Sequence, residues 1–319
     1  MIRLFLVLFV VSLSFRPAMA QEADIWGATV PSSFILYIVA PDRIAGWPAK
    51  LYAYETRYIP EKYRKLPILG SWHGGGGIPD KEMLLKMKVK KAFIFSATPL
   101  HSTDMMYEEI RKLGIEVFLM ESTTVQEDIA LFKKLGEILE VPERGLELAL
   151  YGEEALARTL KIIEAGSEKH PRVYLAGKNG LSSVCNSRLL DLTGAENVYK
   201  CEGTNETFRQ LDFEQIMGFD PDVVLITDPN FASEYHKDPK WKTLRAYREG
   251  RFYVVPHGPF GWMDKPSQAM QFIGMQWLAC TLYPERCNID MLTETKKFIK
   301  LFMHTEMTDK EVAAILTGA

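Results

Sequence analysis

Residues 142–166 read PERGLELALYGEEALARTLKIIEAG, a continuous helical pattern. Pro142 suits the first turn of a helix, and Gly166 suits its C-terminal stop. Apolar residues recur at three- and four-residue spacings along one face, namely Leu146, Leu150, Ala157, Leu160 and Ile163. At 1.5 Å per residue such a helix spans about 36 Å, roughly the diameter of a small domain. The pattern therefore predicts one long helix that joins two lobes, and the alternative is an ordinary surface helix of one domain.

Short apolar strands alternate with helical stretches on both sides of this helix, which is typical of α/β proteins. Before it, we expect strands at 34–39, 91–95 and 116–120 and helices at 80–88, 103–113 and 125–139. After it, we expect strands at 172–176, 223–227 and 252–255 and helices at 187–192, 213–217, 267–282 and 293–304, with a last helix from residue 309. The sequence therefore predicts two Rossmann-like α/β lobes, 21–141 and 167–319, joined by helix 142–166, with a ligand cleft between the lobes.

The first twenty residues have the pattern of a secretory signal peptide. Arg3 precedes a twelve-residue apolar run, 4–15, and Ala18-Met19-Ala20 places small residues at the positions that signal peptidase reads. The run is shorter than the roughly 20 residues that a membrane-spanning helix needs. We therefore expect cleavage after Ala20 and export to the periplasm, with an uncleaved N-terminal anchor as the alternative.

Composition and the absence of familiar motifs narrow the function. The chain has 319 residues, a net charge of −3 and 47% hydrophobic residues, which argues for a globular protein and against a nucleic-acid partner. The sequence contains no GxSxG, HExxH or P-loop pattern, so it indicates no familiar enzyme class.

The four cysteines form an even set in a chain that we expect to be exported, where disulfides are common. Cys280 and Cys287 have six residues between them across a predicted helix end, and they are the favoured local bridge. Cys185 is either bridged to Cys201 or simply buried. The chain has no CxxC pair, which argues against a structural zinc site and against thioredoxin-like chemistry.

The candidate ligand-binding residues lie mostly in loops that follow predicted strands, because ligands of parallel α/β sheets bind at the carboxyl ends of the strands. Residues 66–80 also include four consecutive glycines, which let the backbone approach a ligand closely. The candidates are Trp47, Trp72, His73, Gly74, His101, Lys178, Cys185, Arg188, His257, Trp262 and Lys265. Since imidazole is the commonest side-chain ligand of transition metals, His73, His101 and His257 are candidate contacts to a metal, directly or through a metal complex.

The candidates fit more than one kind of ligand. The basic side chains suit anionic siderophores or oxyanions, and the aromatic side chains suit catecholate, haem or corrin rings. Plainer alternatives stay open, because a lone loop histidine is often only hydrogen-bonded and a single aromatic side chain more often packs in a core. A second hypothesis for function is an exported metal-dependent hydrolase that uses His73, His101 and Asp264.

Segments spread over the chain carry a family resemblance when taken together. They are APDRIAGW (40–47), LPILG (66–70) with 80–88, KLGIEV (112–117), GLS (180–182), LDLTGAENV (190–198), FDPDVV (219–224), WMDKPS (262–267), WLA (277–279) and LYPE (282–285). In combination and order they resemble the periplasmic substrate-binding proteins of ABC transporters for iron complexes and cobalamin. The resemblance implies a non-enzymatic, monomeric, bilobal protein without an intrinsic cofactor. It also implies that the ligand, an iron chelate or a related transition-metal complex, passes to a membrane permease and its ATPase.

Overall fold

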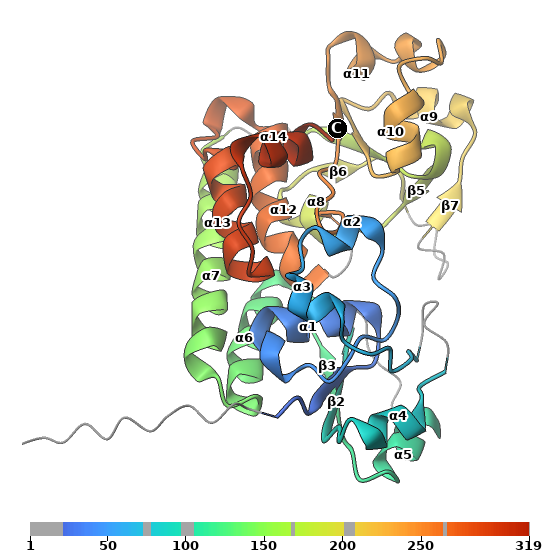
Figure 1. The fold of residues 1–319 in the computed structure, drawn as a ribbon. Helices are drawn as coiled ribbons and strands as arrows, with labels where there is room; N and C mark the ends of the chain where they lie inside the picture. The colour runs from blue at the N-terminus through green and yellow to red at the C-terminus, as the bar shows by residue number, and fades with distance from the viewer. Residues whose placement is uncertain are drawn as a thin grey trace, which may run out of the picture.

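Two lobes and a long helix along one side make up the molecule (Figure 1). The computed structural model describes residues 22–72, 78–96, 105–166, 170–200, 208–263 and 267–318. The first lobe and the long helix contain β1 (Ile25–Gly27), α1 (Val30–Val39), η1 (Pro41–Arg43), α2 (Ala53–Thr56), α3 (Glu61–Arg64), α4 (Lys81–Lys86), β2 (Lys91–Ser96), α5 (Met105–Arg111), β3 (Glu116–Glu121), α6 (Val125–Ile138) and α7 (Pro142–Glu164). The rest contains β4 (Arg172–Ala176), η2 (Lys178–Gly180), β5 (Ser182–Val184), α8 (Arg188–Leu192), β6 (Glu196–Asn197), β7 (Phe208–Gln210), α9 (Phe213–Phe219), β8 (Val223–Ile226), α10 (Pro229–Glu234), η3 (Trp241–Thr243), α11 (Arg245–Arg248), β9 (Phe252–Val254), α12 (Ser267–Leu282), η4 (Pro284–Arg286), α13 (Met291–Met303) and α14 (Asp309–Thr317).

The N-terminal lobe is built on a three-stranded parallel sheet of order β1-β2-β3. The central strand β2 is apolar on both faces because helices cover both faces of the sheet. Phe93 and Phe95 join the core that includes α1 and α6, whereas Ala92 and Ile94 join a second core with α4 and α5. Strand β3 pairs with β2 in parallel, with Phe93 opposite Phe118. The strands predicted at 91–95 and 116–120 are confirmed.

The strand predicted at 34–39 is wrong, because these residues belong to helix α1. The helix is buried along almost its whole length, so its sequence is apolar on every side, and such a run does not distinguish a strand from a buried helix. The start of the helix decides its conformation. The hydroxyl of Thr29 accepts a hydrogen bond from the backbone N–H of Ser32, and Pro31 occupies the first turn. The strand that the sequence analysis missed is the short β1, immediately before this helix.

The C-terminal lobe contains a four-stranded parallel sheet of order β6-β4-β8-β9 and a small antiparallel pair, β5 with β7. Strands β4, β8 and β9 confirm the strands predicted at 172–176, 223–227 and 252–255 within one residue at their ends. Because the strands are parallel, their carboxyl ends share one edge of the sheet, and the loops that follow them gather at that edge.

Helix α7 confirms the long helix predicted from residues 142–166. It packs on α6 of the first lobe and on α12, which follows the second sheet (Figure 1). The face predicted to be apolar is wrong, however, since Leu146 and Leu150 are 47% and 45% exposed. The buried face carries Leu148, Tyr151 and Ile162 with small residues between them, because α6 and α12 approach α7 closely at those small residues. A Cβ atom at Gly145 would lie only 2.8 Å from Cα of Gly136 on α6.

The remaining predicted helices are confirmed within the described residues. They correspond to α4, α5, α6, α8, α9, α12, α13 and α14, and their ends differ from the predicted ones by a few residues. Across the described ranges, no helix is both long enough and apolar enough to cross a membrane.

The C-terminal helices bind the N-terminal lobe as well as their own sheet. The hydroxyl of Tyr37 on α1 donates to the carbonyl of Met303 at 2.7 Å, at the end of α13. The guanidinium of Arg144 on α7 donates to the carbonyls of Ile38 and Leu301, which belong to α1 and α13. One apolar core runs through α1, α6, α7, α12 and α13 and reaches one face of the second sheet. The two lobes are therefore attached to a common helical body.

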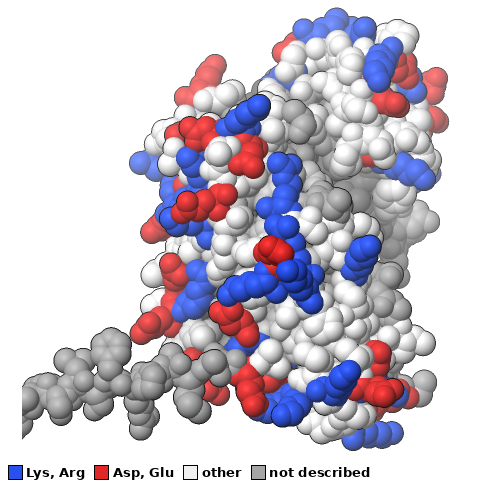
Figure 2. All heavy atoms as spheres, in the orientation of Figure 1, with Lys and Arg blue, Asp and Glu red and all other residues white. Residues whose placement is uncertain are grey.

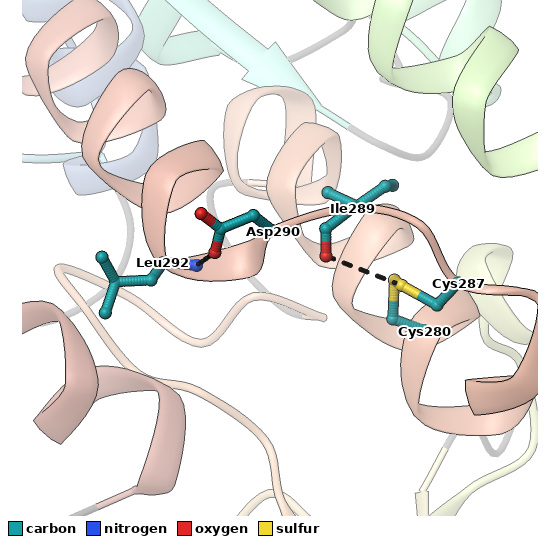
Figure 3. Close-up of a disulfide and its surroundings, with 5 residues drawn as sticks. All are labelled: Cys280, Cys287, Ile289, Asp290 and Leu292. Carbon is teal, nitrogen blue, oxygen red and sulfur yellow. Dashed lines mark hydrogen bonds between the residues drawn. A yellow bond between two sulfur atoms is a disulfide. The ribbon is translucent and has the colours of Figure 1, made fainter.

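Cys280 and Cys287 form a disulfide with a Cα–Cα distance of 4.9 Å, which confirms the predicted local bridge (Figure 3). The bridge joins the last turns of α12 to the residue that ends η4. Just beyond it, the carboxylate of Asp290 accepts the backbone N–H of Leu292 at 3.1 Å and caps α13. The disulfide thus fixes the short connection between the two helices.

Candidate ligand-binding site between the lobes

A pocket of about 530 Å³ lies between the two lobes. The carboxyl end of β8 supplies Thr227, the turn after β9 supplies His257, and helix α14 supplies Ile315. The N-terminal lobe supplies Arg57 and Tyr58 from the segment after α2. A volume of this size falls in the range of roughly 300–1,000 Å³ that is typical of small-molecule sites. The pocket therefore lies where the sequence predicted a ligand, at the carboxyl ends of parallel strands.

The polar groups of this pocket come from both lobes. Arg57 and His257 are exposed, and Arg57 forms no ion pair with any described residue. Tyr58 is buried beside them, and its burial raises the pKa of the phenol, so the hydroxyl stays protonated. A Cβ atom at Gly258 would overlap that hydroxyl, so glycine lets the turn at residues 257–261 approach the N-terminal lobe. The pocket offers a permanent cation, an imidazole and the hydroxyls of Tyr58 and Thr227 beside apolar side chains.

The three tryptophans predicted to contact the ligand are packed in the lobes. Trp47 is 1% exposed, and its indole N–H donates to the carbonyl of Tyr63 at 2.8 Å. Trp72 is 6% exposed and lies 5.5 Å from the ring of Trp26, centroid to centroid. Trp262 is fully buried, and its indole N–H donates back to the carbonyl of residue 258 at 3.2 Å. Their placement corresponds to the core-packing alternative that the sequence analysis left open.

Three other predicted residues belong to the C-terminal lobe and do not line the pocket. Lys178 is exposed on η2. Cys185 is 9% exposed and disulfide-bonded, and its carbonyl accepts a hydrogen bond from the side-chain amide of Asn197. Arg188 starts α8 and forms an ion pair with Asp128, which belongs to α6 of the other lobe. Because α8 contacts β6, it lies near the edge of the sheet opposite β9.

The remaining predicted residues lie outside the described residues. These are His73, Gly74, His101 and Lys265, together with Cys201 and Asp264. Of the three candidate metal ligands, His257 is the one that falls within the described residues, and it lines the pocket. In the part of the chain that the structure describes, no three His, Cys, Asp or Glu side chains converge as a metal site.

Three residues of interest are not singled out by the sequence, namely Arg57, Tyr58 and Asp128. Arg57 and Tyr58 follow a four-residue helix rather than a strand, so the search of loops after strands passes over them. Asp128 lies in the first turn of α6, where an acidic residue is usually a solvated partner of the helix dipole. Only the contact with α8 in the folded protein reveals its burial.

Comparison with known proteins agrees with this architecture. The model of the periplasmic binding protein family matches residues 100–258. An ABC transporter solute binding protein from Sulfurospirillum deleyianum is 26% identical with a TM-score of 0.81, over 92% of this chain and 94% of that one. No curated protein matches this chain significantly in sequence.

Two further structures share the fold. The molybdate periplasmic binding protein MolA of Haemophilus influenzae, solved with molybdate, is 19% identical with a TM-score of 0.69, covering 91% of this chain and 95% of that chain. CeuE of Helicobacter pylori, solved with Ni(II) bound, is 16% identical with a TM-score of 0.66, covering 92% of this chain and 94% of that chain.

The bilobal fold with a pocket between the lobes defines a solute-binding protein. The chain is a periplasmic binding protein of the kind that serves ABC transporters. Such proteins are not enzymes, so the alternative of a metal-dependent hydrolase is not retained. The family also implies a periplasmic location and a permease and ATPase as partners.

Proposed function

We propose that this protein captures an anionic metal chelate, an iron chelate of the siderophore type or a related transition-metal complex, and delivers it to an ABC permease. The observation that carries the proposal is the pocket of about 530 Å³ that both lobes line. A ligand held there contacts Arg57 from one lobe and His257 from the other. Capture between two lobes buries most of a small ligand, which is how binding sites of this size gain affinity.

The charge around the pocket favours an anionic ligand. Exposed basic residues follow one another in and after α2 and α3, namely Arg57, Lys62, Arg64 and Lys65. Figure 2 shows Lys and Arg side chains gathered over these elements, with acidic side chains among them. Lys62 pairs with Asp42 and Lys65 with Glu61, whereas Arg57 forms no ion pair with a described residue and is the one of the four that lines the pocket. A local positive potential raises the concentration and the association rate of anions.

In this proposal the side chain of His257 binds the metal of the chelate. A neutral imidazole binds transition metals, and a chelate that leaves one coordination position open can accept it. His257 comes from the turn after β9, so it reaches the pocket from the sheet, while Arg57 reaches it from the other lobe. The two side chains together select a complex that carries both negative charge and a metal.

Titration calorimetry tests the proposal, with Fe(III)–citrate, a Fe(III)–catecholate, Ni(II)–histidine, haem and cobalamin as probes. We expect one of the metal complexes to bind with one-to-one stoichiometry and to raise the melting temperature. The variant His257→Gln should weaken the binding of that complex at least tenfold. If the complex is an anion, Arg57→Gln should weaken its binding as well. His236→Gln, an exposed histidine outside the pocket, is the matched control and should bind normally. Failure of every complex to bind the wild-type protein would contradict the proposal.

We also propose the organisation that goes with this role. Residues 1–20 act as a signal peptide removed after Ala20, residues 21–141 and 167–319 form the lobes, and residues 142–166 join them. Contacts to the ligand from His73, Gly74, His101 and Lys265 remain part of the proposal. Mass determination of the mature protein, purified from the periplasm, tests the cleavage site.

A further inference from the structure

A second pocket, of about 410 Å³, lies beside β9, which ends the sheet order β6-β4-β8-β9. Arg251 directly precedes this strand and Tyr253 belongs to it, and residues 282–286, at the end of α12 and in η4, complete the lining. We call this hollow the edge-strand pocket. The pocket between the lobes instead takes His257, which follows the carboxyl end of β9. The two pockets share no lining residue, so the edge-strand pocket is separate from the one between the lobes.

Two arginines of the edge-strand pocket have no charged partner. Arg251 and Arg286 are both half-buried, and neither guanidinium forms an ion pair or a hydrogen bond with a described residue. Arg245 on the adjacent α11, in contrast, pairs with Asp220 and Asp222. Two permanent positive charges therefore line one hollow without the acceptors that an arginine in a folded protein usually finds.

The side chain of Arg286 is held in place by packing. Its guanidinium lies over the ring of Tyr283, with Cζ 5.0 Å from the ring centroid. The ring is fixed in turn, because its hydroxyl donates to the carbonyl of Thr193 at 2.9 Å. A Cβ atom at Gly166 would overlap the guanidinium, so the glycine after α7 makes room for it. These contacts position Arg286 without using its N–H groups.

The disulfide shapes most of this pocket. Of the seven lining residues, the five at 282–286 lie between the bridged Cys280 and Cys287, and Arg286 directly precedes the second cysteine (Figure 3). The bridge closes this segment into a short loop and so restricts the positions that Arg286 can take. Groups that are fixed before binding lose less freedom when a ligand arrives, which raises affinity. The disulfide therefore pre-organises the pocket.

The lining residues define the chemistry of a ligand. The planar fork of a guanidinium matches the oxygens of a phosphate group, and a phosphate group carries enough negative charge for two arginines. The hydroxyl of Tyr253 has no hydrogen-bond partner among the described residues and adds another donor. Leu282 and Pro284 supply apolar surface, and a volume of this size accommodates a small organic molecule.

We propose that the edge-strand pocket binds the phosphate group of an organic phosphate ester. Arg251 and Arg286 are its two cationic contacts, and the disulfide positions Arg286. The phosphate group belongs either to a soluble ester or to the headgroup of a phospholipid. Glu285, an exposed acid in the lining, opposes the anion. The inference does not depend on the proposed function, because it uses none of the residues that line the pocket between the lobes.

Calorimetry with glycerol 3-phosphate and phenyl phosphate, and sedimentation with phosphatidylglycerol vesicles, test the proposal. We expect Arg251→Gln and Arg286→Gln each to weaken binding at least tenfold, as for the loss of a charged hydrogen bond. Arg209→Gln, an exposed arginine of β7 without an ion pair to a described residue, is the matched control and should bind as the wild type. Binding of a soluble ester identifies a solute site, and binding of the vesicles alone identifies a headgroup site.

Three further variants give readouts that a purely structural role would not change. Arg286→Lys keeps the charge but not the fork, so it should bind more tightly than Arg286→Gln and more weakly than the wild type. Glu285→Gln removes an exposed like charge and should tighten binding about two- to fivefold. Cys280→Ser/Cys287→Ser, checked by circular dichroism for folding, should weaken binding about threefold or more. Unchanged affinity of this last variant would overturn the role of the disulfide.

Two results would overturn the inference as a whole. One is that neither the soluble esters nor the vesicles bind the wild-type protein. The other is undiminished binding by the double variant Arg251→Gln/Arg286→Gln, shown to be folded by circular dichroism. If Arg57→Gln weakens binding and the double variant does not, the phosphate compound binds between the lobes instead, and the inference is overturned as well. Either failure leaves the proposed function standing, because that function is tested with metal complexes on Arg57 and His257.

Discussion

Arg43 and Asp24 form a buried ion pair with three hydrogen bonds of 2.8–3.0 Å between the guanidinium and the carboxylate. The remaining arm of the guanidinium, Nη1, donates to the carbonyl of Leu139 at 2.7 Å. Asp24 directly precedes β1, Arg43 ends η1, and Leu139 caps the end of α6. One arginine therefore holds together three segments of the N-terminal lobe that are far apart in sequence.

Removal of one charge of this pair should be costly. Both residues are less than 8% exposed, so Asp24→Asn leaves the charge of Arg43 buried without its partner. We expect the free energy of unfolding to fall by about 3–5 kcal/mol, as for other broken buried pairs. Urea denaturation followed by circular dichroism measures the change. Glu306→Gln breaks the exposed pair with Lys300 and, as the control, should cost less than about 1 kcal/mol. Equal losses for the two variants would contradict this view.

The contact between α6 and α7 should not tolerate a methyl group. A Cβ atom at Gly145 would meet the backbone of α6 at Phe132 and Gly136, and backbone cannot move aside as a flexible side chain can. We expect Gly145→Ala to lower the free energy of unfolding by about 1–3 kcal/mol through overpacking.

Gly218 on α9 is the matched control, because a Cβ atom there meets nothing within 4 Å. Gly218→Ala should be neutral or stabilise the protein by up to about 1 kcal/mol, since alanine is the better helix former. Thermal and urea denaturation of both variants test the pair. The idea fails if the Gly145→Ala protein is as stable as the wild type.

The disulfide between Cys280 and Cys287 should stabilise the protein to a limited extent. It closes a short loop, with a sequence separation of 7, so it removes little freedom from the unfolded chain. We expect the double variant Cys280→Ser/Cys287→Ser to lose about 2 kcal/mol of stability. Replacement of both cysteines avoids a free thiol. Denaturation of the variant and of the wild type, each without reductant, gives the value. A loss well above this range would show that the bridge holds more than the connection from α12 to α13.

The sequence predicted the architecture because the relevant signals are local. Helix α7 has a proline at its start, a continuous helical pattern and a glycine after its end, and these signals do not depend on what packs against it. Its buried face was mispredicted for the opposite reason. Which face is buried depends on where α6 and α12 approach, and they approach the small residues rather than Leu146 and Leu150.

The residues that line the pocket between the lobes could be predicted only in part, for a similar reason. His257 follows a strand, so the rule about carboxyl ends finds it. Arg57 reaches the pocket from a segment with no strand before it, and Asp128 resembles any acidic residue in the first turn of a helix. Trp47 and Trp262 are aromatic residues of the kind that often line a ligand pocket, yet in the fold they pack in the apolar core. These roles are decided by tertiary contacts, which a single sequence does not display.

Asp128 should also make the free energy of unfolding of the ligand-free protein depend on pH. Its pKa is raised from 3.8 to about 6, so the folded protein binds this proton more tightly than the unfolded chain does. The resulting stabilisation is fully present below the unfolded pKa and is lost as the pH rises through about 6. Between pH 4 and pH 7 the wild type should therefore lose about 2 kcal/mol of stability relative to Asp128→Asn, which cannot titrate at this position.

Urea denaturation of both proteins at pH 4, 5, 6 and 7 measures this difference. The other carboxyl groups titrate alike in the two proteins, so their effects cancel in the comparison. Loss of the partner of Arg188 lowers the stability of Asp128→Asn by an amount that does not depend on pH, because an arginine stays charged throughout. Only the slope of the difference against pH therefore reports on Asp128. A difference that stays constant from pH 4 to pH 7 would show that this carboxyl is already ionised in the folded protein at pH 4.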